Sequence, residues 1–420
     1  MDTPSPALPS PGLAARSALF LGLVFKASGM SLAVILLPPL GRRMGFSDLE
    51  TGMVMSISAL AGIVMAPVWG MLTERIGRKP VLLLGLFAPA ACLALTAVLV
   101  DLRFSMSVTA GATLAAVFVI RLFQTGFSGS VIPAAQAHMA DTTHRRRRVQ
   151  GMGFLGAAFG LGAILGGMVA WRIGGEAPAL SFALVAALLL LAATGAWLYL
   201  PETAPPRDRP ASTTGTRVNV KGLWPHFLVT LLAVAAYGVM QQVMAIRLQD
   251  YYQAGPVQSV SQAGSILAAA ALCMIFVQGV VIWRLNWTPR AFLVRGSLLA
   301  MLALLGVWAA PGHVSILISM MVFGAGLGLL FPGNLGAISL QTRADGQGRA
   351  AGINAVFQGF GMACGPILGA LLNALSFGAA PAFCVAAFLA AAVLGACRQV
   401  PAEPGTGPAA NDKPSLEPQQ

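Results

Sequence analysis

The dominant pattern along the chain is a series of long apolar runs separated by short polar or basic segments. A helix that crosses a bilayer needs about 20 mostly apolar residues, and twelve runs reach that length. They predict membrane-spanning helices near residues 16–40, 49–73, 80–101, 107–139, 148–172, 177–200, 223–248, 259–284, 289–310, 313–340, 348–375 and 378–398. We therefore expect an all-α membrane protein with twelve transmembrane helices.

One long polar stretch, residues 201–222, divides the spans into six and six. This predicts an N-terminal six-helix bundle at 16–200, a cytoplasmic linker at 201–222 and a C-terminal six-helix bundle at 223–398. The tails, 1–15 and 399–420, are rich in Pro and polar residues, a composition that predicts disorder.

Composition supports a polytopic membrane protein. The chain is 57% hydrophobic and 10% charged, with a mean hydropathy of +0.77. The net charge of +12 does not indicate nucleic acid, because Lys and Arg lie between apolar runs rather than on one basic face. The five cysteines lie in apolar runs without metal-ligand spacing. No nucleophile elbow or phosphate loop occurs, so we predict no enzyme, no metal and no cofactor.

The distribution of basic residues predicts the topology. With the N-terminus inside, the cytoplasmic loops hold 16 Lys and Arg residues and the external loops hold 5. Both termini are therefore predicted to be cytoplasmic.

Three pairs of similar sequence features suggest that the two halves are repeats. Residues 75–80 after span two resemble residues 284–289 after span eight, Pro133 corresponds to Pro332, and the segment 162–166 resembles 365–369. The three features occur in corresponding spans of the two halves. Repeats of this kind place a transporter's substrate site at their interface, near the middle of the membrane.

Two positive charges lie inside apolar runs, Lys26 in the first and Arg121 in the fourth. A charge at bilayer depth costs several kcal/mol unless it faces a cavity or a partner. No Asp or Glu lies in the middle of any run. A cavity with this lining should favour anions or oxygen-rich chelators. Alternatively, Lys26 could lose its proton, which would admit a cation and make Lys26 the coupling group.

The loop between spans two and three reads Gly70-Met-Leu-Thr-Glu-Arg-Ile-Gly-Arg-Lys79. It resembles the major facilitator superfamily signature Gly-x-Leu-x-Asp-Arg-x-Gly-Arg-Lys, with Glu74 in place of the Asp. The resemblance implies a gating loop that latches against the second half, and we expect Arg349 to pair with Glu74. The gating residues are then Gly70, Glu74, Arg75, Gly77, Arg78, Lys79 and Arg349.

Two further segments carry the same resemblance. Arg121-Leu-Phe-Gln-Thr-Gly126 resembles the family's Arg-x-x-Gln-Gly signature, which implies a role for Arg121 in energy coupling. The run of small residues in span five resembles a motif of the family's exporters and permits close helix packing. The predicted packing residues are Gly156, Gly160, Gly162, Gly166 and Gly167, with Gly365, Pro366 and Gly369 in span eleven.

The chain as a whole resembles the drug:proton antiporter branch of this superfamily. The resemblance implies a major facilitator fold, alternating access, a proton gradient as driving force, a monomer in the lipid bilayer of the bacterial inner membrane, and a small-molecule substrate. In the family, spans one, four, seven and ten line the cavity. The matching substrate and coupling candidates are Lys26, Arg121, Gln124, Tyr237, Gln241, Gln242 and Asn334.

Three functions stay open at this point. The first is proton-coupled efflux of an anionic or chelating metabolite, and the chain as a whole resembles bacterial siderophore exporters. The second is broad drug/proton antiport. The third is a membrane receptor that does not transport. The paired motifs in the two halves argue against this third function.

Overall fold

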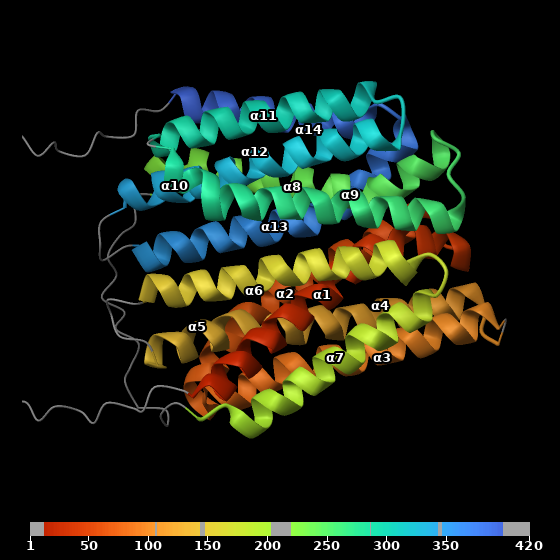
Figure 1. The fold of residues 1–420 in the computed structure, drawn as a ribbon, viewed down its shortest axis with the longest axis horizontal. Helices are drawn as coiled ribbons and strands as arrows, with labels where there is room; N and C mark the ends of the chain where they lie inside the picture. The colour runs from red at the N-terminus through yellow and green to blue at the C-terminus, as the bar shows by residue number, and fades with distance from the viewer. Residues whose placement is uncertain are drawn as a thin grey trace, which may run out of the picture.

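The computed structural model describes residues 12–105, 107–142, 148–202, 220–285, 287–342 and 347–397. Every regular element in these ranges is helical (Figure 1). The first half holds α1 (Leu13–Met44), α2 (Asp48–Ile76), α3 (Arg78–Phe104), α4 (Ala110–Ser128), α5 (Val131–Thr142), α6 (Arg148–Val169), η2 (Ala170–Gly174) and α7 (Pro178–Tyr199). The second holds α8 (Val220–Asp250), α9 (Pro256–Phe276), η3 (Val277–Val281), α10 (Ile282–Arg284), α11 (Pro289–Ala309), α12 (His313–Leu340), α13 (Gln347–Leu375) and α14 (Ala379–Cys397).

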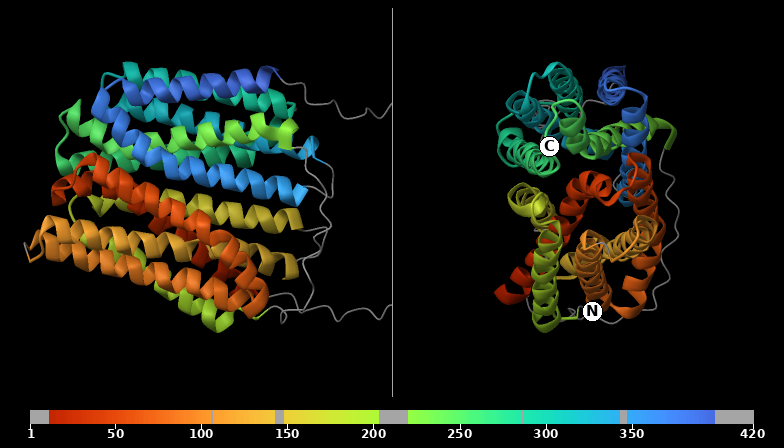
Figure 2. Two further views of the ribbon diagram at one scale, coloured as in Figure 1. Left: turned by 180° about the vertical axis from the view of Figure 1, so that it is seen from behind. Right: turned by 90° about the vertical axis from the view of Figure 1, so that its right-hand side faces the viewer.

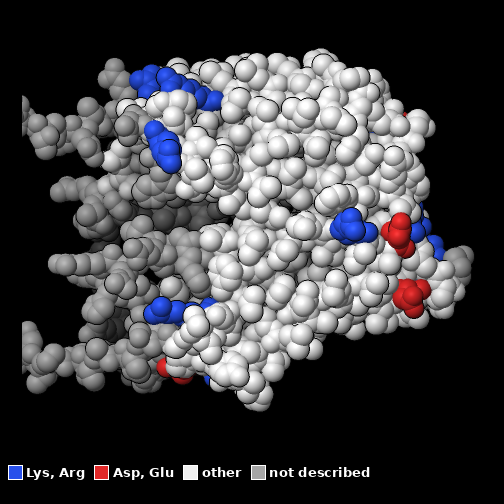
Figure 3. Space-filling view, viewed as in Figure 1, with Lys and Arg blue, Asp and Glu red and all other residues white. Residues whose placement is uncertain are grey.

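Twelve helical segments among the described residues are long and apolar enough to cross a membrane. They coincide with the twelve predicted runs, so the all-α class with two six-helix repeats is confirmed. The two repeats stand side by side (Figure 2). Charged side chains gather toward the two ends of the molecule and leave a broad uncharged band between them (Figure 3).

α1 begins and α14 ends on the same side of the molecule, which we call the termini side (the left in Figure 1). The other side, where α1 ends and α2 begins, we call the far side. The charge distribution predicts that the termini side is cytoplasmic, and this orientation stays a prediction.

Two spans differ from the sequence pattern. α1 runs through Pro38 and Pro39 to Met44 and ends at Gly45, whose φ of +89° is accessible to glycine. The fourth span breaks between α4 and α5. There the side chain of Ser130 donates to the carbonyl of Val81 (3.0 Å), and the Trp69 indole donates to the freed carbonyl of Gly126 (2.7 Å). Trp69 of α2 thus satisfies a carbonyl that the break frees, and the Ser130 side chain ties the break to α3.

The repeats contact each other through α2 with α13 and α6 with α9. A Cβ added at Gly52 would lie 3.0 Å from the carbonyl oxygen of Pro366, and the backbone N–H of Ile367 donates to the hydroxyl of Ser56 (3.0 Å). A Cβ at Gly264 would lie 2.6 Å from the backbone nitrogen of Trp171. Small residues therefore bring backbone against backbone between the repeats.

Candidate functional site

Arg121 lies in the middle of α4, and its side chain is only 4% exposed. Its Nη1 donates to Oε1 of Gln124, one turn along the helix (2.7 Å), and its Nη2 points to the sulfur of Met55 in α2 (3.6 Å). Its Nε has no partner among the described residues. No described ion pair involves Arg121. The guanidinium thus keeps its full charge and one unused donor.

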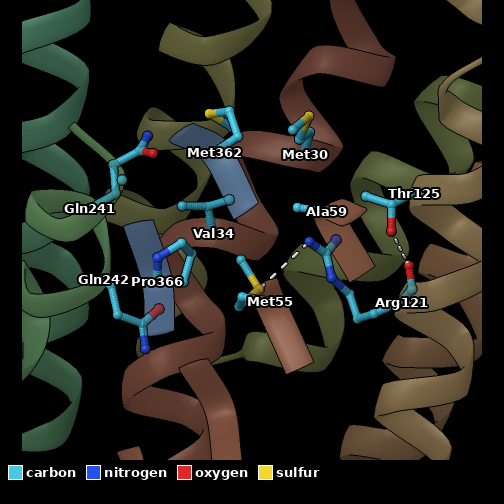
Figure 4. Close-up of a pocket in the computed structure, with 11 residues that line it drawn as sticks. Met30, Val34, Met55, Ala59, Arg121, Thr125, Gln241, Gln242, Met362 and Pro366 are labelled. Carbon is cyan, nitrogen blue, oxygen red and sulfur yellow. Dashed lines mark hydrogen bonds between the residues drawn. The ribbon is translucent and has the colours of Figure 1, made fainter. Parts of the chain in front are cut away.

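A cavity of about 30 Å³ opens at Arg121 (Figure 4). It lies between the repeats, because α1, α2 and α4 contribute one wall and α8 and α13 the other. It is lined by Met30, Val34, Met55, Ala59, Arg121, Thr125, Gly238, Gln241, Gln242, Met362 and Pro366. Ligand pockets for drug-sized molecules measure about 300–1,000 Å³. In this conformation the cavity therefore holds space for water, and a larger substrate requires the repeats to separate.

Gln241 and Gln242 of α8 face Arg121 from the opposite side of this cavity (Figure 4). Gln242 is 1% exposed, and its Nε2 has no partner among the described residues. The Nε of Arg121 and the Nε2 of Gln242 are therefore two buried donors that lack described acceptors. A buried donor without an acceptor costs about 1–3 kcal/mol, so both donors are unfavourable as they stand in this conformation.

Lys26 lies on α1, one turn toward the termini side from the cavity residue Met30 and on the same helix face. Its side chain is 7% exposed, and its Nζ lies 5.3 Å from the centroid of the Phe159 ring in α6. The ring face stabilises the ammonium without neutralising it. Lys26 is not among the cavity-lining residues, so in this conformation it does not share the cavity with Arg121.

The glycines of span five divide between two partners. A Cβ at Gly166 would lie 2.5 Å from the carbonyl oxygen of Ser28 in α1, and one at Gly162 would collide with the carbonyl of Val24. A Cβ at Gly160 or Gly167 would meet α9 of the other repeat, whereas one at Gly156 would meet nothing within 4 Å. In span eleven, Cβ atoms at Gly365 and Gly369 would meet α8, and Pro366 lines the cavity.

Four of the seven predicted substrate and coupling residues do not line the cavity, namely Lys26, Gln124, Tyr237 and Asn334, and the last two face the interior of the second repeat. The ring of Tyr237 stacks 6.4 Å from that of Phe323 in α12, inside the second repeat. Asn334 is 2% exposed and bonds to His226 and Thr230 of α8. Both therefore serve the interior of the second repeat in this conformation.

The predicted gating loop joins α2 to α3 at Gly77, whose φ is +102°. The backbone N–H of Arg78 donates to the carboxylate of Glu202, which follows α7 (2.9 Å). Arg349 is exposed at the start of α13. The side chain of Glu74 lies outside the described residues, so its pairing with Arg349 stays a prediction. The remaining loop residues Gly70, Arg75 and Lys79 lie on the termini side.

Every acidic side chain that the structure describes lies at a helix end, and none lines the cavity. Asp48 and Glu50 stand in the first turn of α2, where Glu50 completes a capping box with Ser47. Asp101, Glu176, Glu202 and Asp250 also lie at helix ends or in turns. Arg121 therefore has no described carboxylate to neutralise it.

The sequence reasoning missed three features of the site. Met30, Met55 and Met362 line the cavity, and thioethers adapt to differently shaped guests. Methionines do occur in spans that were predicted to line the pathway. Met is so frequent in apolar runs, however, that its presence there does not identify a cavity. Arg247, near the far-side end of α8, is 2% exposed, and its Cζ lies 3.5 Å from the centroid of the Phe377 ring. His226 and its buried partners were also missed.

On the far side, an ion-pair cluster joins the repeats. Arg42 at the end of α1 contacts Asp48 of α2 (2.6 Å) and Asp250 at the end of α8 (2.5 Å). Because α1 and α8 belong to different repeats, the contact with Asp250 favours the conformation that is closed on this side.

We expect Asp250→Asn to shift the population away from this closed conformation by roughly 1.4- to fivefold, because exposed ion pairs contribute about 0.2–1 kcal/mol. Spin labels at Ser105 and Ser376, both exposed, would report the distance between the repeats after replacement of the five native cysteines. Asp101→Asn is the matched control, since no described ion pair involves Asp101. Equal distance distributions in both variants would contradict a closing role for Asp250.

Known proteins of similar sequence indicate the family of this chain. The model of the Major Facilitator Superfamily matches residues 19–283 and 227–417. The tetracycline resistance protein, class H, of Pasteurella multocida is 26% identical over 375 residues, covering 85% of this chain and 88% of the relative. Multidrug resistance protein 1 of Bacillus subtilis (strain 168) is 23% identical over 364 residues, covering 84% and 88%.

Solved structures share the fold. The human organic anion transporter MFSD10 (TETRAN) superposes with a TM-score of 0.67 at 19% identity, covering 91% of this chain and 99% of that one. The peptide transporter POT in complex with sulfate superposes with a TM-score of 0.70 at 15% identity, covering 93% and 95%. At these identities the likeness concerns the fold alone.

Proposed function

The chain belongs to the Major Facilitator Superfamily, and from this premise we propose that it exports small organic anions or oxygen-rich chelating molecules in exchange for protons. That it is a multi-pass secondary membrane transporter follows from the family, the twelve candidate spans and the named relatives. The direction, the coupling ion and the substrate class belong to the proposal, as do a monomeric state and a place in the bacterial inner membrane.

The observation that carries the substrate class is the pair of unmatched donors at the cavity. Arg121 Nε and Gln242 Nε2 stand on opposite walls without described acceptors, and no described carboxylate lines the space between them. A guest with carboxylate, enolate or phenolate oxygens would offer acceptors to these donors and balance the guanidinium charge. A lipophilic cation would leave the donors unpaired and add a repelled charge.

The direction rests on likeness rather than geometry. The two bacterial relatives are resistance proteins for tetracycline and for multiple drugs, and the glycine-rich run of span five resembles that of the family's exporters, with Ala163 where the exporters usually have Pro. Tetracycline is rich in oxygen donors and acceptors, so it is the first probe. Siderophores share that chemistry, but neither of these two relatives is named for siderophore transport. Broad drug/proton antiport is the second candidate, favoured by the multidrug resistance relative and by the three cavity methionines.

Inside-out vesicles with an acid interior and a fluorescent pH reporter test the proposal. Tetracycline, a hydroxamate siderophore, a citrate-type siderophore and a lipophilic cation are added separately. Dissipation of the gradient by the oxygen-rich compounds and not by the cation supports the proposal. Dissipation by the cation alone favours the second candidate, and a gradient that no compound dissipates contradicts proton exchange for all four.

Lys26 provides a further prediction. Its ammonium is buried beside Phe159 without a described acidic partner, so the positive charge is unfavourable there. Loss of the proton removes this charge, and binding of an anion neutralises it. We expect Lys26→Met to abolish transport driven by a pH gradient while the protein still reaches the membrane. Uptake of radiolabelled tetracycline into inside-out vesicles measures this. Normal gradient-driven uptake in the variant would remove Lys26 from the coupling mechanism.

A further inference from the structure

A cluster of five polar side chains, three of them buried and two half-buried, lies in the second repeat toward the termini side. We call it the His226 network, and it is formed by His226 and Thr230 of α8, Asn334 of α12, Gln341 at the C-cap of α12, and Asn354 of α13. His226 is 3% exposed and Asn334 is 2% exposed. Neither the cavity nor the gating loop accounts for this network.

The hydrogen bonds determine which imidazole nitrogen carries the hydrogen. Asn334 Nδ2 donates to the carbonyl oxygen of His226 (2.8 Å) and to the hydroxyl of Thr230 (2.9 Å). The Thr230 hydroxyl donates in turn to Oδ1 of Asn354 (2.7 Å). The amide of Asn334 is thereby oriented with its oxygen toward Nδ1 of His226 (2.9 Å). An oxygen accepts, so Nδ1 donates and Nε2 carries the lone pair.

The Nε2 atom faces a side chain that can accommodate a proton. It lies 2.9 Å from Nε2 of Gln341, whose amide group donates to the lone pair. When Nε2 gains a proton it becomes a donor, and the amide of Gln341 can turn to present its oxygen instead. The buried ring is therefore hydrogen-bonded on both sides in either protonation state, which avoids the cost of about 1–3 kcal/mol that an unpaired buried group would carry.

Among the described residues, the charged groups near the network are few. The only described acidic side chain on α8 or on the helices packed against it is Asp250, at the opposite end of α8. The nearest cation by position is the exposed Arg349, about one helical turn before Asn354. The other titratable or charged groups on these elements are Tyr237 and Arg247 on α8, Arg16, Lys26, Arg42 and Arg43 on α1, Cys273 on α9, His313 on α12, Cys364 on α13, and Cys384 and Cys397 on α14. The side chain of Lys221 lies outside the described residues.

We propose that Nε2 of His226 is a binding site for a coupling proton, additional to Lys26. The inference rests on the proposed proton-coupled transport. Histidine is the side chain whose ordinary pKa, about 6.5, lies in the physiological range. The network joins α8, which carries the cavity residues Gln241 and Gln242, to α13, which contacts α2 across the repeat interface. Proton occupancy at His226 thus acts on the two helices that form the second repeat's wall of the cavity.

The proton site is separated from the substrate site. His226 and Gln241 are fifteen residues apart on α8, which corresponds to about 22 Å along a helix. A proton at His226 therefore does not touch the substrate. It acts by changing the hydrogen bond between His226 of α8 and Gln341 at the end of α12. Gln341 is the C-cap of α12 and precedes the connection to α13.

Histidine-selective ¹⁵N NMR of the purified full chain in nanodiscs tests the site without any substrate. The chain has four histidines, so His226→Gln identifies the resonances of His226 by their loss. We expect a neutral form with hydrogen on Nδ1 at pH 9 that converts to the doubly protonated form between pH 8 and pH 5. A ring that does not titrate over this range, or that carries its hydrogen on Nε2, overturns the proposal.

Gln341→Glu gives a sharper readout than removal of the ring. A carboxylate beside Nε2 only accepts and carries a negative charge, so it stabilises the protonated imidazole. We expect the titration midpoint of His226 to rise by about one pH unit or more. An unchanged or lower midpoint would contradict the assignment of Nε2 as the proton-binding atom.

Transport in proteoliposomes tests the coupling role. With tetracycline as the probe, we expect His226→Gln to lower gradient-driven uptake more than tenfold while exchange of labelled for unlabelled tetracycline at equal pH is retained. His313→Gln, the same change at the far end of α12, is the matched control and should behave as wild type. Gradient-driven uptake in His226→Gln within twofold of wild type overturns the proposal. Wild-type protein that moves no tetracycline contradicts the proposed substrate instead, and the NMR titration then decides the proton site alone.

Discussion

Replacing Arg121 by glutamine lowers substrate affinity and transport by about 10- to 100-fold while the protein remains folded in the membrane. The charged donor at the cavity wall is lost, and hydrogen bonds to charged groups contribute about 1.5–3 kcal/mol. Glutamine can still bond to Gln124, so the local packing of α4 survives. The measurement is tetracycline binding and uptake by purified protein, in detergent and in proteoliposomes.

Arg284→Gln is the control for this result, because Arg284 is exposed at the end of α10. It removes the same charge from the chain without touching the cavity. If both variants lose transport equally, the effect arises from net charge or membrane insertion, and Arg121 has no special part in binding.

Replacing Gly166 by valine separates α6 from α1 and destabilises the first repeat. The new Cβ would lie 2.5 Å from the carbonyl oxygen of Ser28 and 2.8 Å from Cβ of Ser31, and a helix backbone cannot move aside as a flexible side chain can. Overpacking of this kind costs about 1–3 kcal/mol and more where backbone must shift. We expect a clear fall in the thermal midpoint of the purified protein and in its yield from membranes.

Gly156→Val is the matched control for this second variant. It makes the same change in the same helix, at a glycine whose Cβ would meet nothing within 4 Å. A thermal midpoint close to wild type is expected there. Equal destabilisation in both variants would mean that the glycines act through flexibility of α6 rather than through its contact with α1.

The fold was predictable because the bilayer sets the length of each apolar run, and the twelve runs matched the twelve spans. The break in the fourth span could not be predicted, because it depends on two tertiary hydrogen bonds: Trp69 of α2 donates to the freed carbonyl of Gly126, and Ser130 at the break donates to the carbonyl of Val81 in α3. The first span was predicted to end near residue 40, whereas the helix continues through Pro38 and Pro39 to Met44.

The site was predictable in part. Arg121 stood out because a charge in an apolar run is rare and costly, and the structure places it at a cavity with Gln241 and Gln242. The sequence did not determine which face of α8 lines that cavity. The close contact between Gly238 and Gly365 sets the rotation of α8 against α13. That rotation turns Tyr237 toward Phe323 of α12, away from the lining.

The buried partners of His226 illustrate the remaining gap. The five members of the network come from three helices and are more than 100 residues apart at their extremes, so sequence spacing carries no sign of them. His226 itself lies near the start of a predicted span, where the sequence indicates a histidine at the interface between membrane and water. Only the packing of α8 against α12 and α13 shows that the ring is enclosed.

We propose that the cavity between the repeats selects acceptor-rich anions or chelators through Arg121 and Gln242. Isothermal titration of the purified protein with tetracycline and, separately, with tetraphenylphosphonium tests this selectivity. We expect tetracycline to bind at least about tenfold more tightly than the cation and Arg121→Gln to erase this preference, as for the loss of one charge-assisted hydrogen bond. Tighter binding of the cation, strengthened further by Arg121→Gln, would contradict it.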